Sequence, residues 1–172
     1  MQADWQAPEK SLNEEHFAAI GRVITEWAAL ERSIAESIVN LLVGREAQFD
    51  DPRTEFAEEI LIAGMDVRVT IGLLRALFRK RKRPVYADEL DKLLDKIALE
   101  GKRRNIFAHA AWRESRKRPN AIETSILRSM GVVDEREHHY TVSEILRLAC
   151  RIKQRRRKLI DFFLIHAPYS DT

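Results

Sequence analysis

Long stretches of this sequence repeat apolar residues every three or four positions, and this helical period is the feature that most constrains the fold. The first stretch begins at Ser11, where Glu14 completes a capping box. It ends near Val43, because Gly44 is a natural helix stop. Its apolar residues are Phe17, Ile20, Val23, Ile24, Trp27, Leu30, Ile34, Ile38 and Leu41. We expect this broad apolar arc to be buried against other helices.

A second helix is predicted from Asp50-Asp51-Pro52, where proline occupies the first turn, to the basic run before Pro84. One line along it carries Phe56, Ile60, Ala63, Val67, Ile71, Leu74 and Phe78. The opposite side carries Ile62, Met65, Val69 and Leu73. A helix that is apolar on two sides lies at the centre of a bundle or in a subunit interface.

Two further helices follow. Pro84 is predicted to break the chain, and the third helix is predicted from about Asp88 to Ala108. The last helix starts at a second capping box, Thr141 with Glu144, and runs to about His166. Its apolar residues are Val142, Ile145, Ala149, Ile152, Leu159 and Phe163. Cys150 lies near the same line and is interpreted as a small core residue.

The helical period is lost between the third and last helices, over residues 110–140. Residues 110–115 and 121–127 have the composition of strands, with a turn between them, and a further extended piece is predicted around 138–140. The whole pattern predicts an all-α fold: an antiparallel bundle of about four long helices with a small β-like insert before the last one. Residues 1–172 are predicted to form one domain, with 1–10 as a loose leader.

Two charged residues interrupt the apolar faces of different helices. Counted from Ile97, Arg104 projects about 20° from the apolar line of the third helix. Glu31 lies about 40° from Trp27 on the first helix. Because a buried charge needs a partner, the two residues are predicted to form an ion pair across the bundle. Such a pair fixes the register of the helices, or it orients Arg104 for a functional role.

Basic residues are clustered, although the net charge is only +3 and the pI is near 9.1. One cluster is the run Arg79, Lys80, Arg81, Lys82 and Arg83. This run is either a solvated helix end that complements the helix dipole or an edge that binds phosphates. The middle of the last helix is also basic. A DNA-binding regulator is a further alternative, and it rests on charge alone.

Several classes of protein are disfavoured. The single cysteine excludes an intramolecular disulfide and a cysteine-based metal cluster, and it fits a reducing, cytoplasmic environment. His109, His138, His139 and His166 lack carboxylates or histidines at helical ligand spacing, so no metal and no cofactor is predicted. The glycines are too scattered for a phosphate-binding loop. No stretch approaches about eighteen consecutive apolar residues, so no membrane partner is expected.

The stretch Arg104-Asn105-Ile106-Phe107-Ala108-His109 resembles the motif of HEPN domains. That motif is an arginine, a polar residue that is often asparagine, and a histidine four to six residues after the arginine. In this family the motif ends a bundle helix and another long helix follows. Trp27-Ala28-Ala29-Leu30-Glu31 is similar to the first helix of many bacterial members. Many toxin-type members have tyrosine two residues after the histidine, where this chain has Ala111.

The resemblance implies a metal-independent endoribonuclease that acts on RNA as a homodimer. Arg104 would stabilise the charge of the phosphorane, and His109 would act as general base or acid. Asn105 would orient the imidazole or the phosphate, and Glu31 would orient Arg104. Arg104 and His109 point about 140° apart on one helix, so two copies around a two-fold axis are better placed to complete a site.

Around that centre, RNA is expected to contact Arg79, Lys80, Arg81, Lys82, Arg83 and Arg103. The resemblance also implies a role in toxin–antitoxin, defence or stress biology, with an antitoxin or another regulatory protein as a further partner. The alternative is a non-catalytic helical module that binds nucleotides or proteins. In that alternative the Glu31–Arg104 pair is structural and the basic runs are solvated.

Overall fold

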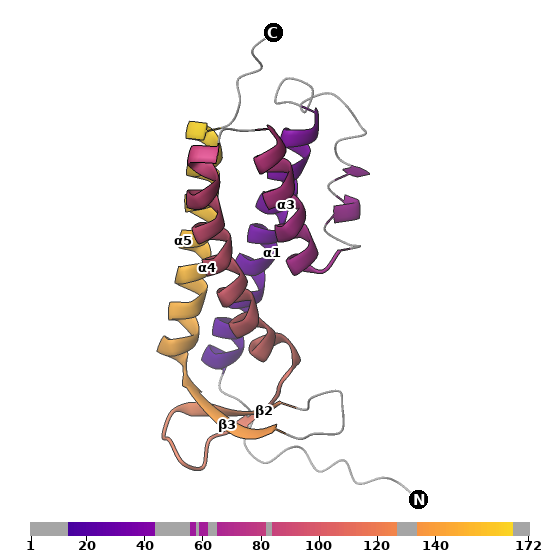
Figure 1. Cartoon of the computed structure of the whole chain (residues 1–172). Helices are drawn as coiled ribbons and strands as arrows, with labels where there is room; N and C mark the ends of the chain where they lie inside the picture. Colours follow the sequence, from indigo (N-terminus) through magenta and orange to yellow (C-terminus); the bar gives the residue numbers. More distant parts are fainter. Residues whose placement is uncertain are drawn as a thin grey trace, which may run out of the picture.

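The computed structural model describes residues 14–43, 56–57, 59–61, 65–81, 84–126 and 134–166. In these residues, long helices lie side by side and a small sheet crosses one end of them (Figure 1). The helices are α1 (Glu14–Val43), α3 (Val67–Arg81), α4 (Pro84–His109) and α5 (Val142–His166). The strands are β1 (Ala111–Glu114), β2 (Ala121–Ile126) and β3 (Asp134–Thr141). The predicted all-α fold with a small β insert before the last helix is confirmed.

The second predicted helix is not continuous, because α3 begins only at Val67. Asp66 caps this new start: its Oδ1 accepts a hydrogen bond from the backbone N–H of Arg68 at 2.8 Å. Its carbonyl oxygen also accepts from the N–H of Thr70 at 3.1 Å. These bonds satisfy groups that have no partner at a helix start, so an aspartate here favours a new helix over continuation of the previous one. Residues 56–57 and 59–61 are helical as a separate piece.

The other helix ends follow from local chemistry. Pro84 does not break the chain as predicted; it is the first residue of α4, where its fixed φ and missing N–H are both tolerated. The predicted capping box of α5 is confirmed. The N–H of Thr141 donates to Oε2 of Glu144 at 2.8 Å, and the N–H of Glu144 donates to Oγ1 of Thr141 at 3.3 Å.

The sheet is antiparallel in the order β1-β2-β3. Asn120 ends the β1–β2 turn with a φ of 56°, a left-handed conformation that asparagine tolerates. Phe107 at the end of α4 joins the sheet to the bundle. Its ring centroid lies 5.2 Å from that of Trp112 in β1 and 4.9 Å from that of Tyr140 in β3. This aromatic cluster holds β3, and the start of α5 that follows it, beside the last turns of α4.

The core is a continuous apolar cluster among α1, α3, α4 and α5, to which β2 adds Ile122. Its largest fully buried side chains are Trp27, Phe78, Leu30, Ile34, Ile38, Leu74, Leu90, Leu94, Ile97, Ile122, Ile145 and Ile152. Trp27 packs directly on Gly101, where a Cβ would lie 2.7 Å from its Cη2 atom. This contact sets the register of α1 against α4. Cys150 is exposed instead of buried, because it lies about 100° around α5 from the buried Ala149.

The prediction that the second helix is apolar on two sides holds for α3. Ile71, Leu74 and Phe78 are buried in the core, while Val69 on the outer side is 54% exposed. Met65, just before the helix, is exposed as well. None of the described helices is both long enough and apolar enough to cross a membrane.

Candidate functional site

The three motif residues lie on the last turns of α4. Nη1 of Arg104 donates a hydrogen bond to Oδ1 of Asn105 at 3.2 Å. Nε of Arg104 is buried and has no hydrogen-bond partner. Asn105 and His109 are exposed, and Arg104 is half-buried, as its position near the apolar line indicates. The structure therefore joins Arg104 to Asn105 and leaves the His109 imidazole open to solvent at the helix end.

The predicted Glu31–Arg104 ion pair is not formed: among the described residues, no hydrogen bond or ion pair joins the two side chains. The register of the helices explains this. α1 and α4 run in opposite directions (Figure 1), and Trp27 packs on Gly101. Glu31 lies four residues beyond Trp27 and Arg104 three beyond Gly101, which separates the two by about 10 Å along the bundle axis. A role for Glu31 in orienting Arg104 thus has no support in this arrangement.

The buried charge on α4 is instead Glu100, whose side chain is 3% exposed. It accepts a hydrogen bond from Nη1 of Arg103 at 3.0 Å and from Nε of Arg151 on α5 at 3.2 Å. This carboxylate was not predicted from the sequence. Its signal was its place on the helix: Glu100 and the buried Phe107 are seven residues apart and share one line to within about 20°. Glu100 ties α4 to α5 and holds two guanidinium groups side by side.

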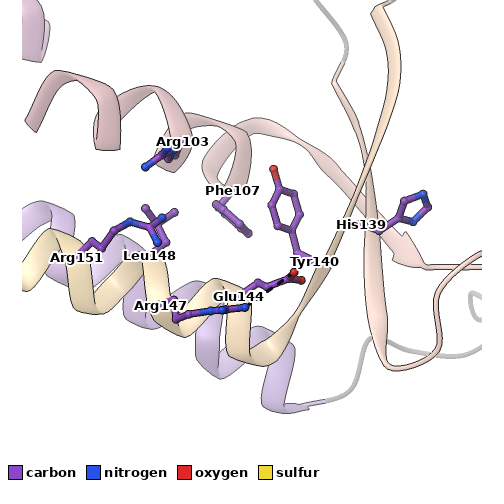
Figure 2. A pocket seen from close by; sticks show the side chains of 8 residues that line it. All are labelled: Arg103, Phe107, His139, Tyr140, Glu144, Arg147, Leu148 and Arg151. Carbon is purple, nitrogen blue, oxygen red and sulfur yellow. Dashed lines mark ion pairs between the residues drawn. The ribbon is translucent and has the colours of Figure 1, made fainter. Parts of the chain in front are cut away.

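These two guanidinium groups line a pocket of about 430 Å³ between α4, β3 and α5. Its lining residues are Arg103, Phe107, His139, Tyr140, Glu144, Arg147, Leu148 and Arg151, and this set is called the arginine pocket below. Figure 2 shows Arg103 on the α4 side and Arg147 and Arg151 on the α5 side, with Phe107 and Tyr140 between them. The volume is within the range of small-molecule sites.

Glu144 is the carboxylate that lines the arginine pocket, and it already has several partners. It accepts the cap hydrogen bonds from Thr141, and it pairs with Arg118 at 3.1 Å and with Arg147 at 4.0 Å. The backbone hydrogen bond from Thr141, with help from Arg118, lowers the pKa of Glu144 below its usual value. Glu144 therefore stays ionised near neutral pH and anchors Arg147 and Arg118 around the pocket.

Tyr140 forms the aromatic wall of the pocket. Burial, together with the charge of Glu144, raises the pKa of its phenol above the usual value, so the hydroxyl is a hydrogen-bond donor at neutral pH. His139 points away from the opening (Figure 2). It lies toward a second buried carboxylate, with Nδ1 at 2.8 Å from Oγ of Ser115 and 3.8 Å from Oε2 of Glu123. His139 is therefore a structural member of the sheet.

The basic run at the end of α3 lies far from the motif residues. Arg79 forms an ion pair with Asp91, which ties α3 to α4, and Lys80 is exposed. The side chain of Arg81, and all of Lys82 and Arg83, lie outside the described residues. The run directly precedes the first residue of α4, whereas His109 is the last residue of α4. The length of that helix separates them by roughly 37 Å. Among the predicted RNA-binding residues whose side chains the structure describes, only Arg103 lines the arginine pocket.

The C-terminal half of α4 thus carries two separate sets of polar groups. Arg103 faces the arginine pocket, whereas Asn105 lies about 160° away around the helix axis. Comparison of the chain with protein-family models, with curated proteins and with solved structures gives no significant match. The function is therefore inferred from the chemistry of these residues.

Proposed function

We propose that the chain is a metal-independent endoribonuclease in which a homodimer presents two copies of Arg104, Asn105 and His109 to one RNA strand. The observation that supports this proposal most strongly is the set of groups around the Arg104 guanidinium. This guanidinium is bonded to the neutral amide of Asn105, and no carboxylate in the described part of the chain pairs with it. A half-buried cation without a counter-ion is suited to an anionic ligand. His109, whose imidazole is exposed, lies five residues further along the same helix.

The proposed reaction needs no reagent other than the RNA. His109 of one protomer takes the proton from a ribose 2′-OH, whose oxygen attacks the neighbouring phosphorus. Arg104 stabilises the negative charge on the phosphorane oxygens. The bond from phosphorus to the 5′ oxygen then breaks, and that oxygen takes a proton from the His109 imidazolium of the partner. The products are a 2′,3′-cyclic phosphate end and a 5′-hydroxyl end.

A dimer is proposed because Arg104 and His109 diverge by about 140° on one helix. Exposed apolar side chains around α3 support such an assembly, since a surface of this kind favours a protein interface. They are Phe56, Ile60, Met65 and Val69. A standard interface needs about 800 Å² from each partner. Light scattering that gives a monomer at tens of micromolar would contradict the dimer, and with it this form of catalysis.

The test is cleavage of single-stranded RNA by the purified chain in EDTA. We expect His109→Ala to lower the rate by about a hundredfold or more, because general acid–base catalysis contributes at least that much. His109 is exposed, so the variant should keep the wild-type circular dichroism spectrum. Lys102→Ala, at an exposed position on the same helix, is the matched control and should cleave at the wild-type rate. Equal slow cleavage by wild type and His109→Ala would refute the proposal.

That refuting result would favour a non-catalytic helical module that binds nucleotides or proteins. The arginine pocket is the observation that favours this second function, because three of its lining residues are arginines that can bind an anion. For the nuclease we further propose a cytoplasmic setting and a role in defence, stress or toxin–antitoxin biology, with an antitoxin or another regulatory protein as partner.

A further inference from the structure

We propose that the arginine pocket binds a phosphomonoester attached to a nucleoside, with the phosphate on the guanidinium groups and the base against the aromatic wall. This site is separate from the Arg104–His109 centre and does not depend on RNA cleavage. The ligand is either a free nucleoside monophosphate or the 5′-phosphorylated end of a nucleic acid strand. Both present the same chemistry to the pocket.

The charges around the pocket leave room for a dianion. Arg103 and Arg151 pair with Glu100, while Arg118 and Arg147 pair with Glu144. Four guanidinium groups against two carboxylates leave an excess of two positive charges. A phosphomonoester carries close to two negative charges at neutral pH. A ligand carboxylate would neutralise half of the excess, and a phosphodiester would do the same.

The guanidinium groups are also held in position before a ligand binds. Glu100 is buried, and its carboxylate accepts hydrogen bonds from Nη1 of Arg103 and Nε of Arg151. Each guanidinium has five N–H donors, so the remaining N–H groups of both side chains can donate to an incoming oxygen. Arg147 is 66% exposed at the rim and completes the set from α5. A guanidinium group can donate two hydrogen bonds to a phosphate at once. Three arginines can therefore supply donors to all three terminal oxygens of a phosphomonoester.

The remaining lining favours a flat organic group. Tyr140 is partly exposed beside the arginines, and the buried side chains of Phe107 and Leu148 line the pocket around it (Figure 2). Bases stack on aromatic side chains whatever their sequence, which suits a nucleoside. The Tyr140 hydroxyl remains a donor, because burial raises the pKa of the phenol. A pocket of about 430 Å³ admits one nucleotide and not a duplex.

The test is calorimetric titration of the full chain with adenosine monophosphate, adenosine and inorganic phosphate. We expect adenosine monophosphate to bind more tightly than either of its parts. Arg147→Gln should weaken this binding by roughly tenfold to a hundredfold, the effect of losing a hydrogen bond to a charged group. Arg157→Gln is the matched control: it is exposed on the same helix, does not line the pocket, and should bind like wild type. Equal affinities for the two variants would overturn the proposal.

Two further arms identify the source of the phosphate and separate this site from the nuclease centre. A 5′-phosphorylated oligonucleotide that binds more tightly than its 5′-hydroxyl counterpart, with Arg147→Gln abolishing the difference, supports a strand end as ligand. Tight binding of adenosine monophosphate without that difference supports a free nucleotide. Binding of both oligonucleotides with equal affinity, with no binding of adenosine monophosphate, refutes the site. The pocket lining contains none of Arg104, Asn105 and His109, so adenosine monophosphate should bind even if RNA cleavage proves absent.

Discussion

Replacing Glu100 by glutamine removes the buried charge that joins α4 to α5. The carboxylate accepts hydrogen bonds from Arg103 and Arg151, and its side chain is 3% exposed. Removing one partner from a fully buried ion pair costs about 3–5 kcal/mol. Here the arginines are 45% and 39% exposed, so water can solvate the charges that remain. We therefore expect a smaller cost, about 1.5–3 kcal/mol, which is the range for losing hydrogen bonds to charged groups.

The assay is urea unfolding followed by far-ultraviolet circular dichroism, with a thermal melt as a second measure. In a domain of this size each kcal/mol lowers Tm by roughly 2–4 °C, so a cost of about 1.5–3 kcal/mol should lower the Tm of Glu100→Gln by about 3–12 °C. Glu89→Gln is the matched control, since Glu89 is exposed on the same helix. It should change the free energy of unfolding by less than about 0.5 kcal/mol. A Glu100→Gln variant as stable as the control would refute the proposed anchoring of the two arginines.

Gly101→Ala should destabilise the fold by about 1–3 kcal/mol in urea unfolding, because the new Cβ would lie 2.7 Å from the buried Trp27 ring. Gly21→Ala, which meets no atom within 4 Å, should instead gain up to about 1 kcal/mol from helix propensity, and equal effects would contradict the packing. The pKa of Glu144 is lowered, chiefly by the hydrogen bond from the Thr141 backbone. The stability that ionised Glu144 adds to the fold is therefore complete above the usual carboxyl pKa of about 4.3, and it is lost as pH falls below that value. Urea midpoints between pH 3 and 6 should therefore fall more steeply for wild type than for Glu144→Gln, and parallel profiles would contradict this.

Much of the fold was predictable because it depends on local signals. The apolar period located the helices, and the capping box of Thr141 and Glu144 located the start of α5 within one residue. The start of α3 was missed, although Asp66 is a good cap, because the apolar lines continue through it. Pro84 was interpreted as a break when it is a favourable first residue of a helix.

The site was harder to predict because it depends on how the helices are placed against one another. Periodicity correctly placed Arg104 near the apolar face, but it did not show which residues of α1 lie beside which residues of α4. The Trp27–Gly101 contact sets this axial alignment, which separates Glu31 from Arg104. The partner of Glu100 on α5 is 51 residues away in sequence, so no local pattern connects the two. Ion pairs between helices follow from packing, which a single sequence leaves open.

In the proposed reaction this chain cleaves RNA by using the neighbouring 2′-OH, and His109 moves the proton. Mass spectrometry of the products formed from a defined single-stranded RNA in EDTA identifies the nucleophile. We expect 2′,3′-cyclic phosphate ends paired with 5′-hydroxyl ends, formed by wild type and lost in His109→Ala. Products with 5′-phosphate ends, or identical products from both proteins, would contradict it.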